Sequence, residues 1–256
     1  MIVNLKDRIR KGELLSGTWL NLGSVMTAEI AGKAGFDWVC IDCEHGAGDH
    51  TEMLHQLHAV GCTPTAPLVR VAWNDPVRFK RVLDMGASGI VVPYVTDALQ
   101  AHAAVSAMRY PPAGVRGVSK MTRAADFSKS FGTYFAQANE QLVLVVQIET
   151  RGAVEQVPAI AAVEGVDVVF IGPLDLTVSL GCMNNFEHPD YKHALKVVVD
   201  SCRKEGKAAG ILVGDPKQIP PLVEMGFTFI GIASDGGVVL DGLCRLASTF
   251  DPLRRK

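Results

Sequence analysis

The stretch Leu142-Val143-Leu144-Val145-Val146-Gln147-Ile148-Glu149-Thr150 reads as a buried strand that ends in an acidic residue. A second stretch, Val168-Val169-Phe170-Ile171-Gly172-Pro173-Leu174-Asp175-Leu176, has the same form: an apolar run, turn residues and an acidic residue. In parallel β/α proteins, polar groups that follow the carboxyl ends of strands lie at the ligand-binding face. Glu149 and Asp175 are therefore predicted to share one site.

Short apolar strands alternate with helical stretches along the whole chain of 256 residues, which predicts βα units and a parallel sheet. Eight units at this length predict one (β/α)8 barrel domain that spans residues 1–256. The alternative is an open doubly wound sheet, but no GxGxxG follows any expected strand. The eight expected strands are Ser16–Leu22, Trp38–Cys43, Pro67–Val71, Gly89–Val95, Leu142–Glu149, Val166–Ile171, Ala208–Val213 and Phe227–Ala233.

Capping residues predict where several helices begin and end. Thr27 is expected to cap a helix over Ala28–Ala34, and Asp75-Pro76 to open one over Val77–Met85. Pro189–Glu205 reads as a helix that Gly206 ends. The long connection Arg109–Asn139 is expected to be a functional loop or lid, because connections of this length are uncommon in compact domains.

Composition argues against several classes of partner. The net charge is −2 and no basic run is present, so neither nucleic acid nor an anionic membrane is expected to bind. No stretch is long and apolar enough to span a bilayer, and the N-terminus lacks the apolar core of a signal peptide, so we expect a cytoplasmic protein. The six cysteines are interpreted as reduced side chains.

Alternation in the fifth strand indicates which side chains face the barrel axis. Val143, Val145, Gln147 and Glu149 form one face and are expected to point inward, while the wholly apolar face packs on helices. Two carboxylates, completed by waters and a chelating substrate, suit Mg2+ or Mn2+. The alternative is that Glu149 pairs with an arginine and Asp175 caps a helix.

The turn at Gly172-Pro173-Leu174-Asp175 offers a second kind of contact. Free backbone N–H groups at a helix start attract a carboxylate or a phosphate. Gly172 and Leu174 are therefore candidate substrate-binding positions beside the metal. Ser234-Asp235-Gly236-Gly237, after the eighth strand, is either a phosphate cradle or an ordinary turn.

Two other strands deliver polar groups to the same end of the barrel. The second strand ends in Asp42-Cys43-Glu44-His45, where His45 is a candidate base and Asp42 could orient it. The third strand ends in Arg70, which could stabilise negative charge on a substrate. The alternatives are a structural histidine and an ion pair at the rim.

These residues also carry a resemblance that covers most of the chain. The sequence resembles the HpcH/HpaI aldolase family, in particular its metal-dependent class II pyruvate aldolases. The matching stretches are Gly35-Phe36-Asp37-Trp38 with Ile41-Asp42-Cys43-Glu44-His45, Val69-Arg70 with Trp73-Asn74-Asp75-Pro76, Leu83-Asp84-Met85-Gly86-Ala87, Arg109-Tyr110-Pro111-Pro112 with Gly114-Val115-Arg116-Gly117, Gln147-Ile148-Glu149-Thr150 and Gly172-Pro173-Leu174-Asp175-Leu176.

The resemblance implies a role for each site residue. Glu149 and Asp175 bind a divalent metal ion, Mg2+, Mn2+ or Co2+. Gln147 and the backbone around Leu174 and Asp175 contact the pyruvate part of the substrate. His45 acts as the acid/base residue, and Arg70 stabilises the enolate. Asp42 is the partner of His45, and Asp84 raises the basicity of that histidine.

The resemblance further implies an activity and an assembly. The activity is reversible cleavage of 4-hydroxy-2-oxo acids, such as 4-hydroxy-2-oxoheptanedioate, to pyruvate and an aldehyde. A Schiff-base route is not expected, because none of the expected strands carries a lysine. The assembly is a homohexamer in which the last helix is exchanged between subunits. The remaining alternatives are oxaloacetate decarboxylation, a citrate-lyase-like acyl-CoA lyase and a barrel without turnover.

Overall fold

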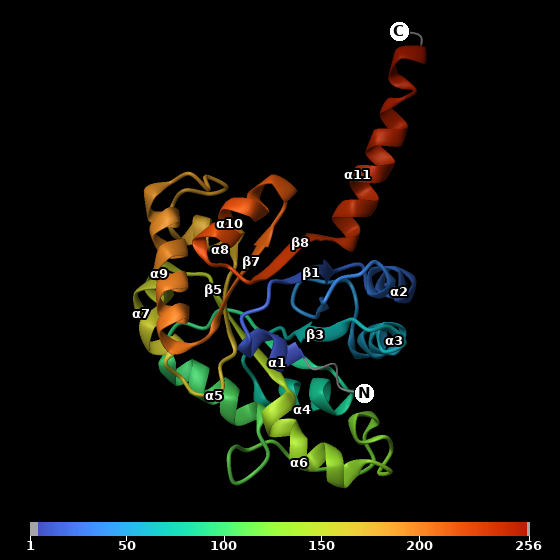
Figure 1. Cartoon of the computed structure of the whole chain (residues 1–256). Helices are drawn as coiled ribbons and strands as arrows, with labels where there is room; N and C mark the ends of the chain where they lie inside the picture. Colours follow the sequence, from blue (N-terminus) through green and yellow to red (C-terminus); the bar gives the residue numbers. More distant parts are fainter. Residues whose placement is uncertain (1–4, 255–256) are drawn as a thin grey trace.

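The computed structural model describes residues 5–254 of the chain. Within this range eight parallel strands form a closed barrel in chain order, and β8 pairs with β1 to complete the ring (Figure 1). The predicted (β/α)8 barrel is thus confirmed. The strands are β1 Leu15–Leu20, β2 Trp38–Asp42, β3 Ala66–Arg70, β4 Gly89–Val92, β5 Val143–Ile148, β6 Val168–Ile171, β7 Ala208–Val213 and β8 Phe229–Ser234.

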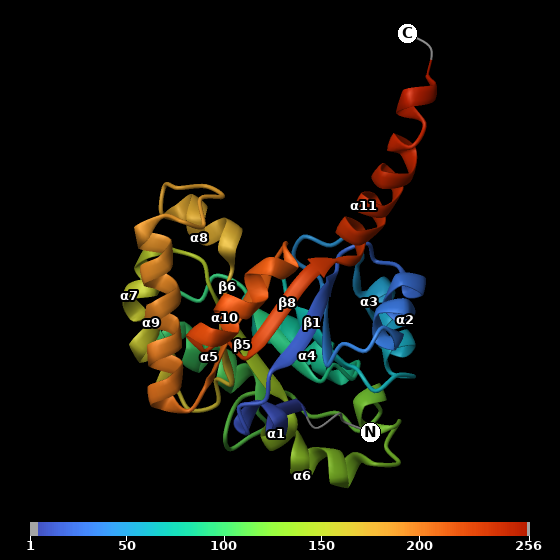
Figure 2. The ribbon, with the colours of Figure 1, turned by 45° about the horizontal axis from the view of Figure 1, so that its top comes forward.

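Helices surround the barrel, as the alternation of strands and helical stretches requires (Figure 2). Asp75 caps the helix that begins at Pro76, and Gly206, with a φ of 64°, ends the helix that begins at Pro189, both as predicted. The described helices are α1 Leu5–Arg10, α2 Val25–Lys33, α3 His50–Val60, α4 Pro76–Asp84, α5 Ala98–Met108, α6 Phe131–Gln141, α7 Arg151–Ala161, α8 Pro173–Ser179, α9 Pro189–Glu205, α10 Ile219–Met225 and α11 Asp235–Ser248.

The predicted cap of α2 is wrong. The helix begins three residues earlier than expected, at Val25, because Ser24 is the N-cap and its hydroxyl accepts the backbone N–H of Thr27. The Thr27 hydroxyl instead donates to Asp235 Oδ2 at 2.6 Å, a contact between the first helix after β1 and the residue that follows β8.

Two apolar layers hold the barrel together. One layer fills the barrel, where Trp38 stacks on Phe229 with ring centroids 4.3 Å apart. The other layer lies between the strands and the helices. Val143 and Val145 belong to the inner layer, whereas Leu142, Leu144, Val146 and Ile148 belong to the outer one. The alternation predicted for the fifth strand is therefore confirmed.

A buried ion pair closes the end of the barrel where the strands begin. Lys6 Nζ lies 3.0 Å from Asp167 Oδ2 and donates to the carbonyl oxygen of Leu142 at 2.9 Å. Both charged side chains are buried, and each neutralises the charge of the other, which would cost free energy if it were buried alone.

The connection between α5 and β5 lies at this same closed end, so the expectation of a lid over Arg109–Asn139 is wrong. A segment that joins the end of a helix to the start of the next strand must lie where strands begin, and part of it forms α6. One residue of the segment is anchored inside the protein: the buried Arg116 guanidinium donates to Asp84 Oδ1 at 2.7 Å and lies over the Tyr110 ring.

The last helix, α11, projects away from the barrel rather than packing on it (Figures 1 and 2). Asp235 fixes its base, since the Asp235 carboxylate accepts the backbone N–H groups of Asn21 and Leu22. Apolar side chains on and just after the helix are exposed, namely Val238, Val239, Leu240, Leu243, Leu246, Phe250 and Leu253. Such a face is what a helix buries against another surface.

Within residues 5–254, no helix combines the length and the apolar character that crossing a membrane requires.

Candidate active site

A cavity of about 530 Å³ opens where the strands of the barrel end. Its deepest wall is apolar and includes Trp19 and Phe170, whose rings lie 5.4 Å apart. The structure brings together eight of the nine residues expected from the sequence, and they line this cavity: Asp42, His45, Arg70, Gln147, Glu149, Gly172, Leu174 and Asp175. They come from the ends of strands β2, β3, β5 and β6, as the rule for β/α barrels requires.

Glu149 follows β5 and is only 2% exposed. Its Oε2 accepts the backbone N–H of Tyr94 at 2.8 Å. Burial raises the pKa of Glu149 to about 7, and the neighbouring acidic groups of Asp175 and Glu44 add to this shift. A buried carboxyl group surrounded by like charges is stabilised as an anion when a cation binds beside it.

Asp175 lies in the first turn of α8, just beyond β6. Its Oδ1 accepts the hydroxyl of Tyr94 at 3.0 Å, so one tyrosine contacts both acidic residues. Burial raises the pKa of the Tyr94 phenol to about 12, and the bond to Asp175 acts in the same direction, so the phenol is a donor at neutral pH. Tyr94 has a φ of 52°, a conformation that costs a residue other than glycine about 1–3 kcal/mol.

Sequence reasoning missed Tyr94. The sequence predicts one strand over Gly89–Val95, but β4 ends at Val92 and the chain turns at Tyr94. No local signal distinguishes this tyrosine from a strand residue, since tyrosine itself favours strands.

The absence of a side chain at Gly172 leaves space for the Glu149 carboxylate. A Cβ atom at Gly172 would lie 2.6 Å from both Cγ and Oε1 of Glu149. Gly172 is also the N-cap of α8 and supplies no side-chain cap for the first turn of that helix. The first-turn N–H groups, which include those of Leu174 and Asp175, can therefore be reached by an anionic ligand.

Arg70 is held by two acidic side chains. Its Nε and Nη2 donate to the two carboxylate oxygens of Asp42 at 2.9 and 2.7 Å, and its Nη1 lies 3.1 Å from Glu44 Oε2. Burial acts to raise the pKa of Asp42, but the Arg70 guanidinium outweighs it and the pKa lies below its usual value. Burial raises the pKa of Glu44. Glu44, given no role from the sequence, is thus part of the site.

The relation expected between Asp42 and His45 is wrong in its detail. Asp42 Oδ1 accepts the backbone N–H of His45 at 3.2 Å, so it positions the loop, while its carboxylate pairs with Arg70. The His45 side chain is 67% exposed at the mouth of the cavity, and its Nε2 lies 3.8 Å from Glu44 Oε1. The acidic neighbour of the imidazole is therefore Glu44.

Asp84 lies apart from this group. It is the last residue of α4, close to the end of the barrel where β4 begins, and it pairs with Arg116 at 2.7 Å. Asp84 does not reach His45 within one chain, because helices that follow strands return the chain to the opposite end of the barrel, and the implied effect of Asp84 on His45 stays a prediction.

The side chains of this cavity provide only some of the oxygen ligands that a divalent ion requires. Across residues 5–254, no three histidine, cysteine or acidic side chains are grouped as a metal site. Glu149 and Asp175 could supply two oxygen ligands, and a chelating substrate and water would supply the others. Beside them Gln147 is 2% exposed, and its Oε1 has no hydrogen-bond partner among the described residues, so a ligand can use it.

Residues 15–242 match the family model described as HpcH/HpaI aldolase/citrate lyase. The chain belongs to this family. It is 41% identical over 246 residues to a protein of Klebsiella pneumoniae named 4-hydroxy-2-oxo-heptane-1,7-dioate aldolase, covering 96% of this chain and 92% of that one.

Solved structures agree with this assignment. A family member from Burkholderia cenocepacia superimposes with a TM-score of 0.92 at 37% identity, covering 96% of this chain and 98% of the other. The structure named citrate synthase SbnG has a TM-score of 0.86 at 26% identity, with 96% and 97% covered.

Proposed function

We propose that this member of the family is a metal-dependent carbon–carbon lyase, a class II pyruvate aldolase. It cleaves 4-hydroxy-2-oxo acids reversibly to pyruvate and an aldehyde. The observation that carries the proposal is the pair Glu149 and Asp175, joined through Tyr94, in one cavity with Arg70. The names of its relatives support 4-hydroxy-2-oxoheptanedioate as a substrate.

Glu149 and Asp175 would hold the divalent ion, Mg2+, Mn2+ or Co2+. When bound, the ion would supply Lewis-acid polarisation of the keto oxygen. Gln147 Oε1 and the amides of Leu174 and Asp175 would hold the 2-oxo acid part of the substrate against the apolar wall of the cavity.

His45 would take the proton from the 4-hydroxyl group, because its imidazole lies at the open mouth of the cavity. The C3–C4 bond then breaks, an aldehyde leaves, and pyruvate remains as its enolate. The Arg70 guanidinium, fixed by Asp42 and Glu44, would stabilise the negative charge of that enolate. Return of the proton held by His45 to the enolate carbon, directly or through water, gives pyruvate and restores the neutral imidazole.

The test is pyruvate release from 4-hydroxy-2-oxoheptanedioate by EDTA-stripped protein, with and without Mg2+, Mn2+ or Co2+. We expect release only with metal, and none from Glu149→Gln. Release that persists without metal, or that survives in Glu149→Gln, contradicts the proposal. Glu140→Gln, a change at an exposed carboxylate that lies 3.5 Å from Arg10, serves as the matched control.

The alternatives are separated by substrate. Oxaloacetate decarboxylation would use the same enolate and is measured in the same assay with oxaloacetate in place of the hydroxy acid. A citrate-lyase-like reaction would require CoA thioesters and a basic pocket for their phosphates, whereas Arg70 is the one arginine or lysine among the described residues that line this cavity. If the protein cleaves a CoA thioester faster than the hydroxy-oxo acid, the assignment changes from aldolase to acyl-CoA lyase.

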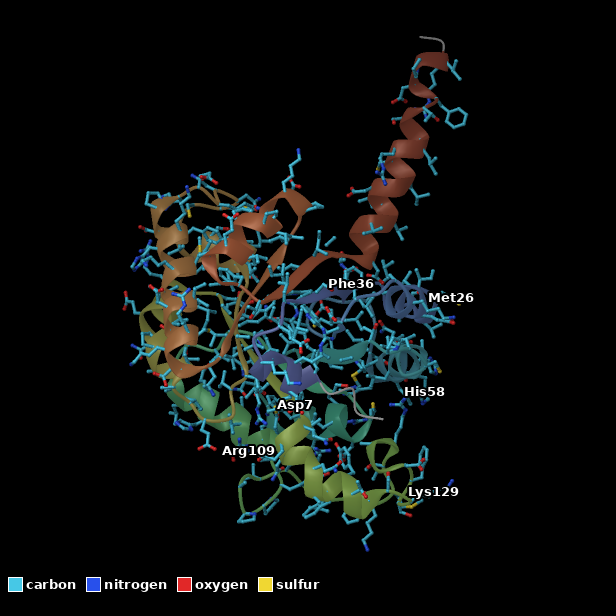
Figure 3. The ribbon with its side chains drawn as sticks, viewed as in Figure 1. Asp7, Met26, Phe36, His58, Arg109 and Lys129 are labelled. Atoms are coloured by element: carbon cyan, nitrogen blue, oxygen red, sulfur yellow. The ribbon has the colours of Figure 1, made fainter. Side chains whose placement is uncertain are left out.

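We also propose that the full chain, residues 1–256, acts as one domain in a cytoplasmic homo-oligomer, a hexamer, with α11 exchanged between subunits. The exposed apolar face of α11 supports the exchange, and so does an exposed apolar face on α2. Met26 on that helix lies at the outer surface, and the side chains of α11 extend into open space (Figure 3). A second copy of this chain would bury both faces.

A further inference from the structure

Tyr94 is the residue through which the two acidic groups of the site are connected. It follows β4, whereas Glu149 follows β5 and Asp175 lies beyond β6, so the tyrosine reaches across one intervening strand end. Its amide donates to Glu149 Oε2 at 2.8 Å and its hydroxyl donates to Asp175 Oδ1 at 3.0 Å. We propose that Tyr94 is a positioning residue that holds these two carboxylates in the arrangement that binds the metal ion.

The backbone of Tyr94 gives the first argument. Its φ of 52° lies in the left-handed region, which a bulky aromatic residue rarely adopts and which glycine adopts freely. Glycine could supply the turn and the amide alone. A tyrosine in this conformation is therefore best explained by what its side chain adds, and the contact its hydroxyl makes is with Asp175.

The charges of the site give the second argument. Once both are ionised, Glu149 and Asp175 repel each other, and Glu44 is a third acidic group close to them. Without fixed donors, such carboxylates turn away from one another. Each of the two has one oxygen bound by Tyr94, which leaves the other oxygen of each, Oε1 of Glu149 and Oδ2 of Asp175, for a cation.

This inference rests on the proposed function, because it assigns the two carboxylates to a metal ion. Groups that orient metal ligands typically change metal affinity by about 10–100-fold when they are removed. Tyr94→Phe is the informative change: it keeps the amide that contacts Glu149 and removes only the hydroxyl that contacts Asp175.

The experiment is calorimetric titration of Mn2+ into EDTA-stripped full-length protein, without substrate, for wild type, Tyr94→Phe and Glu149→Gln. Tyr191→Phe is the matched control, since it removes a hydroxyl from a buried tyrosine on α9. Thermal unfolding of each metal-free protein checks that the fold is intact. We expect the Kd for Mn2+ to rise about tenfold or more in Tyr94→Phe at an unchanged Tm, and to be unchanged in Tyr191→Phe.

A Kd in Tyr94→Phe that is within threefold of wild type, or lower, overturns the inference and leaves the proposed function intact. A wild-type protein that binds neither Mn2+ nor, in the same titration, Mg2+ or Co2+ overturns both. Weaker binding accompanied by an equal loss in Tyr191→Phe also overturns the inference, because the effect would then follow from loss of any buried tyrosine hydroxyl.

Discussion

Gly172→Ala tests whether the position of Glu149 decides metal binding. Alanine is compatible with the φ of −90° at this position, so the backbone is not strained. The added Cβ would lie 2.6 Å from Glu149 Cγ and Oε1, and 3.0 Å from Cδ, which is closer than carbon and oxygen atoms pack. Because Glu149 is the flexible partner, its side chain must move.

The magnitude follows from how Glu149 is held. Its carboxylate is 2% exposed and is bound by the Tyr94 amide, so displacement breaks a buried hydrogen bond as well as overfilling the site. Overfilling a packed site costs about 1–3 kcal/mol. If this cost falls on the position that binds the ion, the Kd for a divalent ion rises about 5- to 150-fold, since about 1.4 kcal/mol corresponds to tenfold.

The assay is titration of Mn2+ into metal-free protein, followed by metal-dependent pyruvate release at saturating metal. Gly152→Ala is the matched control, because a Cβ at Gly152, on the exposed face of α7, meets no atom within 4 Å. That control should bind metal normally and be more stable by up to about 1 kcal/mol. A Kd in Gly172→Ala equal to that of wild type would refute the reasoning, because Glu149 would then not need its present position.

Arg70→Ala should lower kcat about 10²- to 10³-fold and leave metal affinity nearly unchanged; steady-state kinetics checks this, and unchanged turnover would exclude the role assigned to Arg70. The pKa of Glu149 is about 7 in the folded protein, against a usual pKa of 4.5, so the folded state binds this proton more tightly than the unfolded state does. The free energy of unfolding of the metal-free protein should therefore fall as pH rises from about 4.5 to 7, by at most about 3 kcal/mol. Urea unfolding at several pH values measures this slope, which should flatten in Glu149→Gln; an identical slope in both proteins would show that other groups cause it. Leu243→Glu, on the exposed face of α11, should reduce the mass of the assembly in light scattering, whereas Arg245→Gln should not; an unchanged mass in both would argue against helix exchange.

The sequence by itself was enough to predict the barrel and the end at which its candidate site lies. Strand signals are local: runs of β-branched residues, their alternation and the turn residues after them are all read over fewer than about ten positions. The same holds for the caps at Asp75 and Gly206, which depend on neighbouring residues only. Since parallel strands must end at one face, polar residues after the strands had to meet there.

Only the tertiary structure decided which polar groups contact each other. Asp42 and Arg70 are paired by the register of β2 and β3, which turns the Asp42 carboxylate to the guanidinium rather than to the imidazole of His45. Asp84 stands in a stretch that resembles the family, Leu83-Asp84-Met85-Gly86-Ala87, but it pairs with Arg116 near the opposite end of the barrel.

The physical reason is the distance along the chain over which these contacts form. Tyr94 meets Glu149 across 55 residues and Asp175 across 81, and Asp42 meets Arg70 across 28. Past the last residue of a strand, alternation no longer fixes where a side chain points, because loop dihedral angles are set by what the loop packs on. The left-handed turn at Tyr94 arises in this way, and it determines how the two carboxylates of the site are held.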